Sequence, residues 1–503
     1  MTDNFAKRSW PQRLMRWSAW LMMALLLITA TVIVGAAVDA RNRLPDLQPW
    51  HRLIPQAEVR ARDIDDRFTL ADYLKREDTV FAEVRSRIED ALPPEQAHMA
   101  NRYSRSSRSS PTRLDRDYNR TFEVEPRELK GGALLIHGLT DSPYSMRAIA
   151  QQLQADGYYS LVLRMPGHGT VPAGLVDITA EDWNAAVRLG ARHVRGRIGT
   201  NRPFIVVGYS NGGALAVRYA LDALQDSSLP PPTRLVLVSP MIGVSPFASL
   251  ARVISALGVV PYFEKARWLD VIPEYNPFKY NSFPANAGFQ TFKVTRDLQK
   301  QLTRAAENGR LKQFPPTLAF QSLVDATVST SAVVAGLFDR LPSNGNELIL
   351  FDINRLSRLD PFLQPSDLAL MARLFERRPR AYRVTLVTNA RPDTLDVAAR
   401  HVEAGSIEPV DEPTGLTWPR DLFSLSHVAL PFPEDDPVYG GLAKDSPTAP
   451  VALGLLSPRG EKSVLTVPVE VLMRVSANPF FPYLARRVSE WLAVPGSRLS
   501  THD

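Results

Sequence analysis

The feature that most constrains the fold is the alternation, from residue 121 onward, of short apolar runs with segments of helical periodicity. Continuous apolar strands separated by helices indicate a parallel sheet covered by helices on both faces. We therefore predict an α/β fold with a mostly parallel sheet. The predicted strands are 131–138 (ending in a turn), 159–164, 203–207 and 234–238, and the predicted helices are 143–155, 179–194 and 212–224, the second with Thr179 and Asp182 as a capping pair.

The motif Gly208-Tyr209-Ser210-Asn211-Gly212 lies between the third of these strands and the third helix. A G-x-S-x-G sequence at a tight strand-to-helix turn projects the serine hydroxyl above the sheet, and Gly208 and Gly212 leave room for close backbone approach. The N-terminus of the following helix favours negative charge that develops at this point. This context predicts that Ser210 is a nucleophile, with an incidental turn serine as the alternative.

Further motifs surround this serine between Leu134 and Gly169. They are His137-Gly138-Leu139, Asp141-Ser142-Pro143-Tyr144 and Arg164-Met165-Pro166-Gly167-His168-Gly169. Together with the serine motif, they resemble the α/β-hydrolase superfamily, and within it the group of monoacylglycerol lipases, bacterial carboxylesterases and serine aminopeptidases. The resemblance covers residues 121 to about 495 and implies the α/β-hydrolase fold with an inserted cap.

The resemblance also implies roles for the loop after the first strand. The backbone N–H groups of Leu139 and Asn211 would form the oxyanion hole. His137 and Gly138 would support that loop, and His137 is expected to order the loop rather than act as the base. His168 is expected to be a structural turn residue. Ser142 is a second serine in these motifs, but we expect it to cap the next helix rather than to act as a nucleophile.

The acid and the base are expected after the nucleophile, in the order Asp or Glu and then His. Asp325 ends the predicted strand 317–324 and matches the acid position that the resemblance implies; capping of the following helix is its structural alternative. A late loop carries the histidine in the family, which favours His427 as the base. The other two histidines after Asp325 are His401, in a segment predicted to be helical over 394–400, and His502, in the tail.

Two stretches exceed what a minimal hydrolase of this type needs. The second, about 343–415, contains strand candidates at 347–352 and 382–388 and a predicted helix at 365–378, and we expect it to extend the sheet edge. The first, about 242–315, corresponds to the cap, whose aromatic residues should mostly form its own core while some face Ser210. Those aromatic residues are Phe247, Tyr262, Phe263, Trp268, Tyr275, Phe278, Tyr280, Phe283, Phe289 and Phe292.

Residues 17–38 form an uncharged stretch of 22 residues. As a helix it would be about 33 Å long, which is enough to cross a hydrocarbon core of about 30 Å. Basic residues before it favour a cytoplasmic segment 1–16, a signal-anchor helix at 17–38 and an extracytoplasmic body in a single-pass inner-membrane protein. A cleaved signal peptide is the alternative, but its apolar core is usually shorter.

Residues 39–120 are rich in charge and are predicted to form a helical stalk followed by a flexible linker. An amphipathic helix is expected over 69–92, ended by Pro93-Pro94. The Arg- and Ser-rich stretch 102–116 is typical of a flexible tether. The hydrolase domain is then expected to occupy 121–503 and to close with a helix over 482–492.

Composition excludes several other functions. The chain has no Cys, so a Cys nucleophile, Cys-ligated zinc, iron–sulfur clusters and a disulfide framework are excluded. The net charge of +6 is too small for this length to indicate nucleic acid. Asp435 and Asp436 have no neighbouring His ligand, so we expect a solvated turn there and no metal or cofactor.

These observations predict a membrane-anchored serine hydrolase that cleaves carboxylic esters, either lipid-like or small acyl esters, through Ser210, His427 and Asp325. Amide or thioester cleavage by the same residues is one alternative. A non-catalytic envelope scaffold that retains the fold is another.

Overall fold

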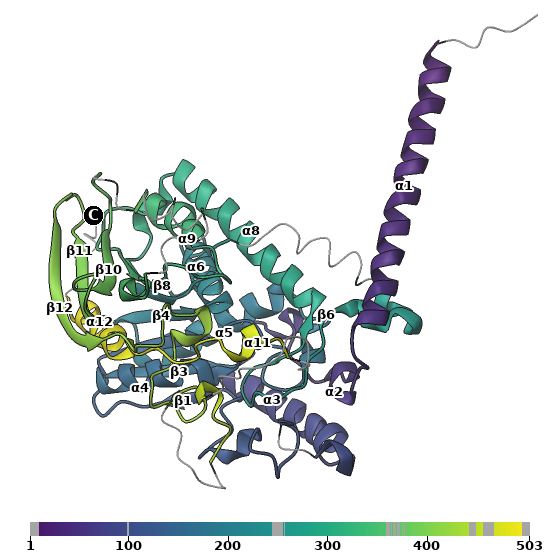
Figure 1. Cartoon of the computed structure of the whole chain (residues 1–503), viewed down its shortest axis with the longest axis horizontal. Coiled ribbons are helices and arrows are strands. Elements are labelled where there is room, and N and C mark those ends of the chain that lie inside the picture. Colours follow the sequence, from purple (N-terminus) through teal and green to yellow (C-terminus); the bar gives the residue numbers. More distant parts are fainter. Residues whose placement is uncertain are drawn as a thin grey trace, which may run out of the picture.

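The computed structural model contains one large sheet that helices enclose, with a long helix projecting from it (Figure 1). It describes residues 10–97, 100–243, 255, 257–358, 363, 365, 369, 373–374, 376, 378–441, 449–455 and 467–494. Most of the predicted helix over 365–378 lies outside these residues, as do residues 1–9, Phe247 and His502.

The sheet has ten strands in the order β1-β3-β2-β4-β5-β8-β9-β10-β11-β12. The seven strands from β3 to β10 are parallel, whereas β1, β11 and β12 are antiparallel to their neighbours. The strands are β1 Phe122–Val124, β2 Gly131–Ile136, β3 Tyr158–Leu163, β4 Phe204–Tyr209, β5 Arg234–Val238, β8 Thr317–Ser322, β9 Glu347–Phe351, β10 Arg383–Asn389, β11 Asp396–Val402 and β12 Pro409–Thr417. The predicted parallel sheet is therefore confirmed.

Helices cover both faces of this sheet, as predicted. Leu134 and Ile136 of β2 pack in the same apolar core as α5 (Ala180–Ile198), α6 (Asn211–Ala223) and α8 (Ala285–Glu307). The intervening side chains Ala133 and Leu135 pack on the other face with α4 (Arg147–Ala155) and α12 (Phe481–Ala493). Because alternate residues of a strand point to opposite faces, a strand buried on both sides must be apolar throughout.

The second insertion differs from its prediction. It adds two strands that the sequence did not indicate, β11 and β12, and His401 lies in β11 rather than in a helix. The segment 394–400 contains good helix formers, but pairing with β10 on one side and β12 on the other outweighs that local preference. Arg400 and Asp411 form an ion pair of 2.7 Å across the two added strands.

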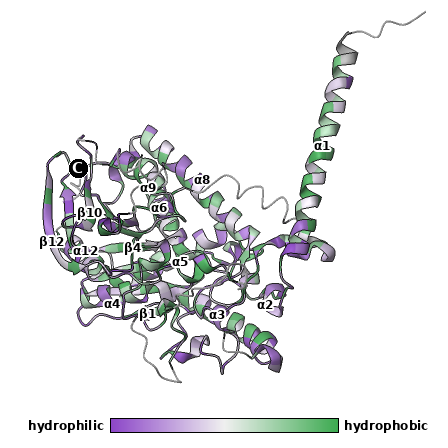
Figure 2. Ribbon diagram, in the orientation of Figure 1, coloured by the Kyte–Doolittle hydropathy of each residue, from purple (hydrophilic) through white to green (hydrophobic). Residues whose placement is uncertain are grey.

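The N-terminal helix α1 (Trp10–Arg43) projects from the body and is apolar along most of its length (Figures 1 and 2). An 18-residue window within its segment Leu14–Arg43 has a mean hydropathy of 2.6, and 6% of that window is buried. Among the described residues it is the one helix long and apolar enough to cross a membrane, and a signal sequence passes the same test. The C-terminal end of α1 is different, because Ala37 and Ala40 are buried against the body.

The segment predicted to be a stalk and flexible linker packs against the body instead. Its main helix, α3 (Leu70–Val84), buries Leu70 and Tyr73 in the same core as the strands. In the stretch expected to be a tether, Arg102 and Tyr103 are buried, and the Arg102 N–H donates to the carbonyl of Glu274. Serine and arginine side chains make turn and carbonyl hydrogen bonds there, which composition alone did not reveal.

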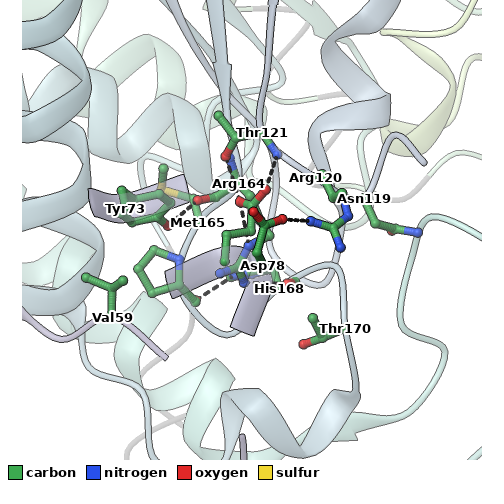
Figure 3. A network of polar contacts seen from close by, with 12 residues as sticks. Val59, Tyr73, Asp78, Asn119, Arg120, Thr121, Arg164, Met165, His168 and Thr170 are labelled. Carbon is green, nitrogen blue, oxygen red and sulfur yellow. Dashed lines mark hydrogen bonds and ion pairs between the residues drawn. The ribbon is translucent and has the colours of Figure 1, made fainter. Parts of the chain in front are cut away.

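A buried ion cluster fixes this segment to the sheet (Figure 3). Arg164, directly after β3, is fully buried and pairs with Glu58 at 2.8 Å and with Glu77 at 3.0 Å. The Tyr73 hydroxyl donates to the carbonyl oxygen of Arg164 at 2.6 Å, and the Thr121 hydroxyl donates to Glu77. A buried charge is stable only when it is paired and hydrogen-bonded, so these partners depend on one another.

We expect Arg164→Ala to destabilise the full chain by about 3–5 kcal/mol, because it leaves two carboxylates buried without their cation. Urea unfolding of the detergent-solubilised protein, followed by tryptophan fluorescence, measures the loss. Arg197→Ala removes one partner of an exposed pair with Glu125 and should leave the midpoint nearly unchanged. Equal midpoints for the two variants would contradict the structural role of the cluster.

Candidate active site

Ser210 lies at the turn between β4 and α6 in a strained backbone conformation. Its φ is +54° and its ψ is −118°, a region that residues with a side chain rarely adopt. The Ser210 N–H donates to the carbonyl of Val238 on β5, and its own carbonyl accepts from the N–H of Met241. These bonds to the neighbouring strand hold the turn, so the hydroxyl stands at the carboxyl edge of the parallel sheet.

The two glycines of the motif permit this turn by allowing backbone to approach backbone. A Cβ added to Gly212 would collide with the carbonyl of Ile136 on β2, and a Cβ on Gly208 would collide with the backbone of Gly212. Helix α6 therefore begins very close to β2 and β4. Only glycine at both positions allows that approach.

The structure brings Ser210, His427 and Asp325 together from three distant parts of the chain. The Ser210 hydroxyl lies 3.0 Å from Nε2 of His427, and Nδ1 of His427 lies 2.9 Å from the Asp325 carboxylate. Both side chains of the His–Asp pair are nearly inaccessible to solvent, at 4% and 0% exposure. The line of contacts can carry a proton from the hydroxyl to the imidazole while the carboxylate fixes the tautomer.

Asp325 is held as an anion by several donors. Burial alone would raise the pKa of this carboxyl group, but the neighbouring His427 and the N–H groups of Val328 and Thr327 outweigh it and lower the pKa. Asp325 does not cap the following helix α9 (Thr330–Gly336), because Ser329 occupies that position. The structural alternative for Asp325 is therefore wrong.

Two residues that sequence reasoning missed also orient the relay. The Gln321 amide donates to the Asp325 carboxylate at 2.9 Å, and the Tyr209 ring stacks on the His427 ring with centroids 5.4 Å apart. Gln321 gives a sequence signal, because it interrupts the apolar run Leu318-Ala319-Phe320 four positions before Asp325. Tyr209 occupies a variable position of the G-x-S-x-G motif, so the motif does not identify it as a contact of His427.

The loop after β2 lies against the serine. A Cβ added to Gly138 would be 3.1 Å from the Ser210 Cβ. His137 accepts the N–H of Met165 at Nε2, so its Nδ1 donates to the Gly138 carbonyl, and burial lowers the pKa of its imidazole well below the usual value. A neutral imidazole bonded on both sides orders the loop, and no bond joins it to Ser210 in the described part of the chain.

The amides of Leu139 and Asn211 are available as donors. Neither donates a hydrogen bond to an acceptor within the described part of the chain. The Asn211 N–H begins α6, where the first amides of a helix have no partner inside the helix. Thr140, next to Leu139, adopts a φ of +62° and accepts the N–H of Tyr280 from the cap.

The other polar residues singled out by sequence play structural parts or differ from expectation. Asp436 is buried rather than solvated, and it accepts the Tyr144 hydroxyl at 2.7 Å and pairs with Arg147 at 3.0 Å. Ser142 stands at the N-cap position before a short 3-10 turn, but its side chain makes no capping bond. His168 donates to the Pro166 carbonyl, and burial lowers its pKa to about 4.

The described residues contain no group of three or more His, Asp or Glu side chains that could hold a metal ion. Of the described cap aromatics, Trp268, Phe278 and Tyr280 are buried, and they pack in apolar clusters shared with the body rather than in a core of the cap alone. Phe278 stacks on Tyr144 with centroids 4.0 Å apart, and the Tyr280 hydroxyl donates to the Gly167 carbonyl at 3.1 Å. Tyr262 is exposed, at 56%.

Part of the chain is similar to known proteins. The family model described as serine aminopeptidase, S33, matches residues 127–353. A thermostable monoacylglycerol lipase of Bacillus sp. (strain H-257) is 37% identical over 89 residues, which are 18% of this chain and 34% of that enzyme, so the chain spans about a third of that relative's length.

Among solved structures, one from work on LipS and LipT, two metagenome-derived lipolytic enzymes, is 24% identical and has a TM-score of 0.38. The match covers 46% of this chain and 87% of that one. A monoacylglycerol lipase of Paleococcus ferrophilus is 17% identical, with a TM-score of 0.35, covering 46% of this chain and 88% of that one. The family match and the sheet confirm the predicted resemblance to the α/β-hydrolase superfamily and its fold, and the matched relatives are serine hydrolases.

The strained turn has a measurable consequence for stability that does not depend on catalysis. We expect Ser210→Gly to be more stable than Ser210→Ala by about 1 kcal/mol, since the relief of strain exceeds the entropy that glycine loses on folding. Denaturant unfolding of both variants measures the difference. At Ser489, inside helix α12, the same pair should show the opposite order, with Gly less stable than Ala by about 1 kcal/mol. The same order at both positions would contradict the strain.

Proposed function

We propose that this chain, whose residues 127–353 match the serine aminopeptidase family of α/β hydrolases, is a serine hydrolase that cleaves carboxylic esters. The observation that carries the proposal is the relay from the Asp325 carboxylate through His427 to the Ser210 hydroxyl, with contacts of 2.9 and 3.0 Å. The fold alone does not determine an activity, but this constellation at a strand-to-helix turn has a specific chemistry.

In the proposed reaction, the Ser210 oxygen forms a bond to the ester carbonyl carbon while His427 takes the hydroxyl proton. The amides of Leu139 and Asn211 stabilise the resulting oxyanion, and Asp325 stabilises the imidazolium. The carbon–oxygen bond to the alcohol then breaks, and His427 returns the proton to the leaving alcohol. Water, deprotonated by His427, attacks the acyl-enzyme and releases the acid and Ser210.

Ester cleavage is favoured over aminopeptidase activity by the state of Asp141. An aminopeptidase needs a free carboxylate near the nucleophile to bind the substrate's ammonium group. Asp141, next to the Gly138 loop, is a buried acid whose pKa is raised by burial, against the opposing effect of Lys279, 4.0 Å away. A carboxyl group that burial makes harder to ionise, and that already has a cation beside it, is a poor ammonium site.

The proposal includes membrane anchoring. Helix α1 would cross the inner membrane once with its N-terminus in the cytoplasm, and the body would lie on the extracytoplasmic side. The long apolar and exposed surface of α1 supports this, because exposed apolar area of that extent is unfavourable in water. A lipid-like ester is a suitable substrate for an enzyme in that position.

A fluorophosphonate probe tests whether the serine is activated. We expect wild-type protein to be labelled and Ser210→Ala to lose the label, because only a serine with an adjacent base attacks the probe rapidly. Ser142→Ala is the matched control: its hydroxyl is also buried near the loop but has no hydrogen-bond partner in the described part of the chain, so labelling should persist. Unlabelled wild-type protein would favour the non-catalytic scaffold.

The acid is tested by steady-state kinetics on a soluble short-chain ester. We expect Asp325→Asn to lower kcat by about 10⁴-fold, because an amide no longer fixes the productive tautomer of His427. Asp435→Asn changes an exposed carboxylate and should leave kcat unchanged. Comparable rates for the two variants would remove Asp325 from the relay. Parallel amide and thioester substrates identify the preferred bond.

A further inference from the structure

The cap makes its most unusual contact with the end of the apolar helix α1. The cap residues concerned form two short 3-10 turns, Leu257–Val259 and Pro261–Arg267, followed by β6 (Trp268–Asp270). The second turn packs beside the last part of α1, at the right of the body in Figure 1. Ala40 and Leu44 share an apolar cluster with Trp268.

Polar contacts fix this arrangement. The Lys265 ammonium donates to the carbonyl of Leu44 at 2.8 Å and to Asp46 at 2.9 Å, just beyond the end of α1, where a cation is favoured by the helix dipole. The Arg41 guanidinium lies 4.1 Å above the Tyr262 ring and also donates to the Tyr262 carbonyl. The cap is therefore joined to the end of α1 at two of its residues, Tyr262 and Lys265.

These contacts determine how far the cap lies from the proposed bilayer. Arg41 is three positions beyond the last residue of the uncharged stretch, Val38, which corresponds to about 4.5 Å along the helix axis. With α1 across the bilayer, Tyr262, which contacts Arg41, would lie at the headgroup boundary, where aromatic rings and amphipathic elements settle at depths of about 5–10 Å.

The surface of the cap at this height is apolar and open. Val260 is 49% exposed, Tyr262 56% and Leu269 44%, although the turn that contains Tyr262 packs against α1. Isolated exposed apolar residues are ordinary on a protein surface, but Tyr262 lies against Arg41 at the end of a membrane-length helix, and Val260 is two positions before it in the chain. Burial of such residues in a lipid interface is favourable.

We infer that residues 257–269 of the cap insert into the headgroup region of the same bilayer that α1 spans. The inference rests on the proposed function, since it needs α1 as a membrane anchor. The cap would then have two boundaries: the lipid surface at Val260 and Tyr262, and the catalytic loops at Tyr280, whose N–H donates to the carbonyl of Thr140 at 2.8 Å. A lipid surface, rather than a protein partner, is the occupant.

The absence of Cys makes a direct test possible. Single substitutions Val32→Cys, Val260→Cys and Val410→Cys are labelled with an environment-sensitive fluorophore in the full chain. The protein is reconstituted into phosphatidylethanolamine and phosphatidylglycerol vesicles that contain a phospholipid with a nitroxide near its headgroup. The three positions are matched valines of 56%, 49% and 52% exposure, on α1, on the cap and on β12. Hydrolysis of a soluble ester checks each labelled variant separately.

We expect the nitroxide lipid to quench the labels at 32 and 260 and to leave emission at 410 unchanged. Quenching at 32 without quenching at 260 would overturn the inference while leaving the anchor intact. A label at 260 with blue-shifted but unquenched emission would indicate a protein contact and would also overturn it. No quenching at 32 would remove the anchor and the inference with it, whereas ester hydrolysis in the same sample would show that the catalytic proposal survives.

Discussion

The close approach of α6 to β2 and β4 is the constraint on which the site depends. Gly208 and Gly212 let the backbone pass where a Cβ would collide, and the Ser210 turn takes a conformation that few residues adopt. The strain persists because bonds from Val238 and Met241 hold the turn on the sheet. A hydroxyl held in this way is already placed for contact with His427, and strain of this kind commonly persists at functional sites.

The second constraint is that His427 must reach this fixed hydroxyl from a loop more than two hundred residues away. Several contacts restrict that loop: Tyr209 stacks on the imidazole, and the Ser322 hydroxyl donates to the Leu425 carbonyl at 2.8 Å. Both contacts come from β4 and β8, the strands that also precede Ser210 and Asp325. The sheet therefore positions the His427 loop as well as the ends of its own strands. The added strands β11 and β12 extend the edge of the sheet, and His427 still contacts Ser210.

The sequence was sufficient where a residue's role depends on local pattern. The apolar strands, the G-x-S-x-G turn and the capping box of Thr179 and Asp182 follow from residues close together in the chain. The sequence was insufficient where the role of a residue depends on partners that are distant in the chain. His401 lies in a strand because β10 and β12 pair with β11, and Asp436 is buried because Tyr144 and Arg147 approach it from nearly three hundred residues away. The stretch 102–116 has a tether's composition but packs on the cap and the body for the same reason.

The N-terminal segment is connected to the loops around Ser210 by a continuous path of hydrogen bonds. Glu58 and Glu77 hold Arg164, and the N–H of the next residue, Met165, donates to His137, whose ring in turn donates to the Gly138 carbonyl. Arg164 also donates to the carbonyl of His168 at 2.9 Å, which closes the turn on its other side. Because each group in this path is buried and has few alternative partners, displacement of the two glutamates would leave the loop beside Ser210 less restricted. The charged segment between α1 and β1 is therefore better understood as a support of the loop beside Ser210 than as a spacer between α1 and the body.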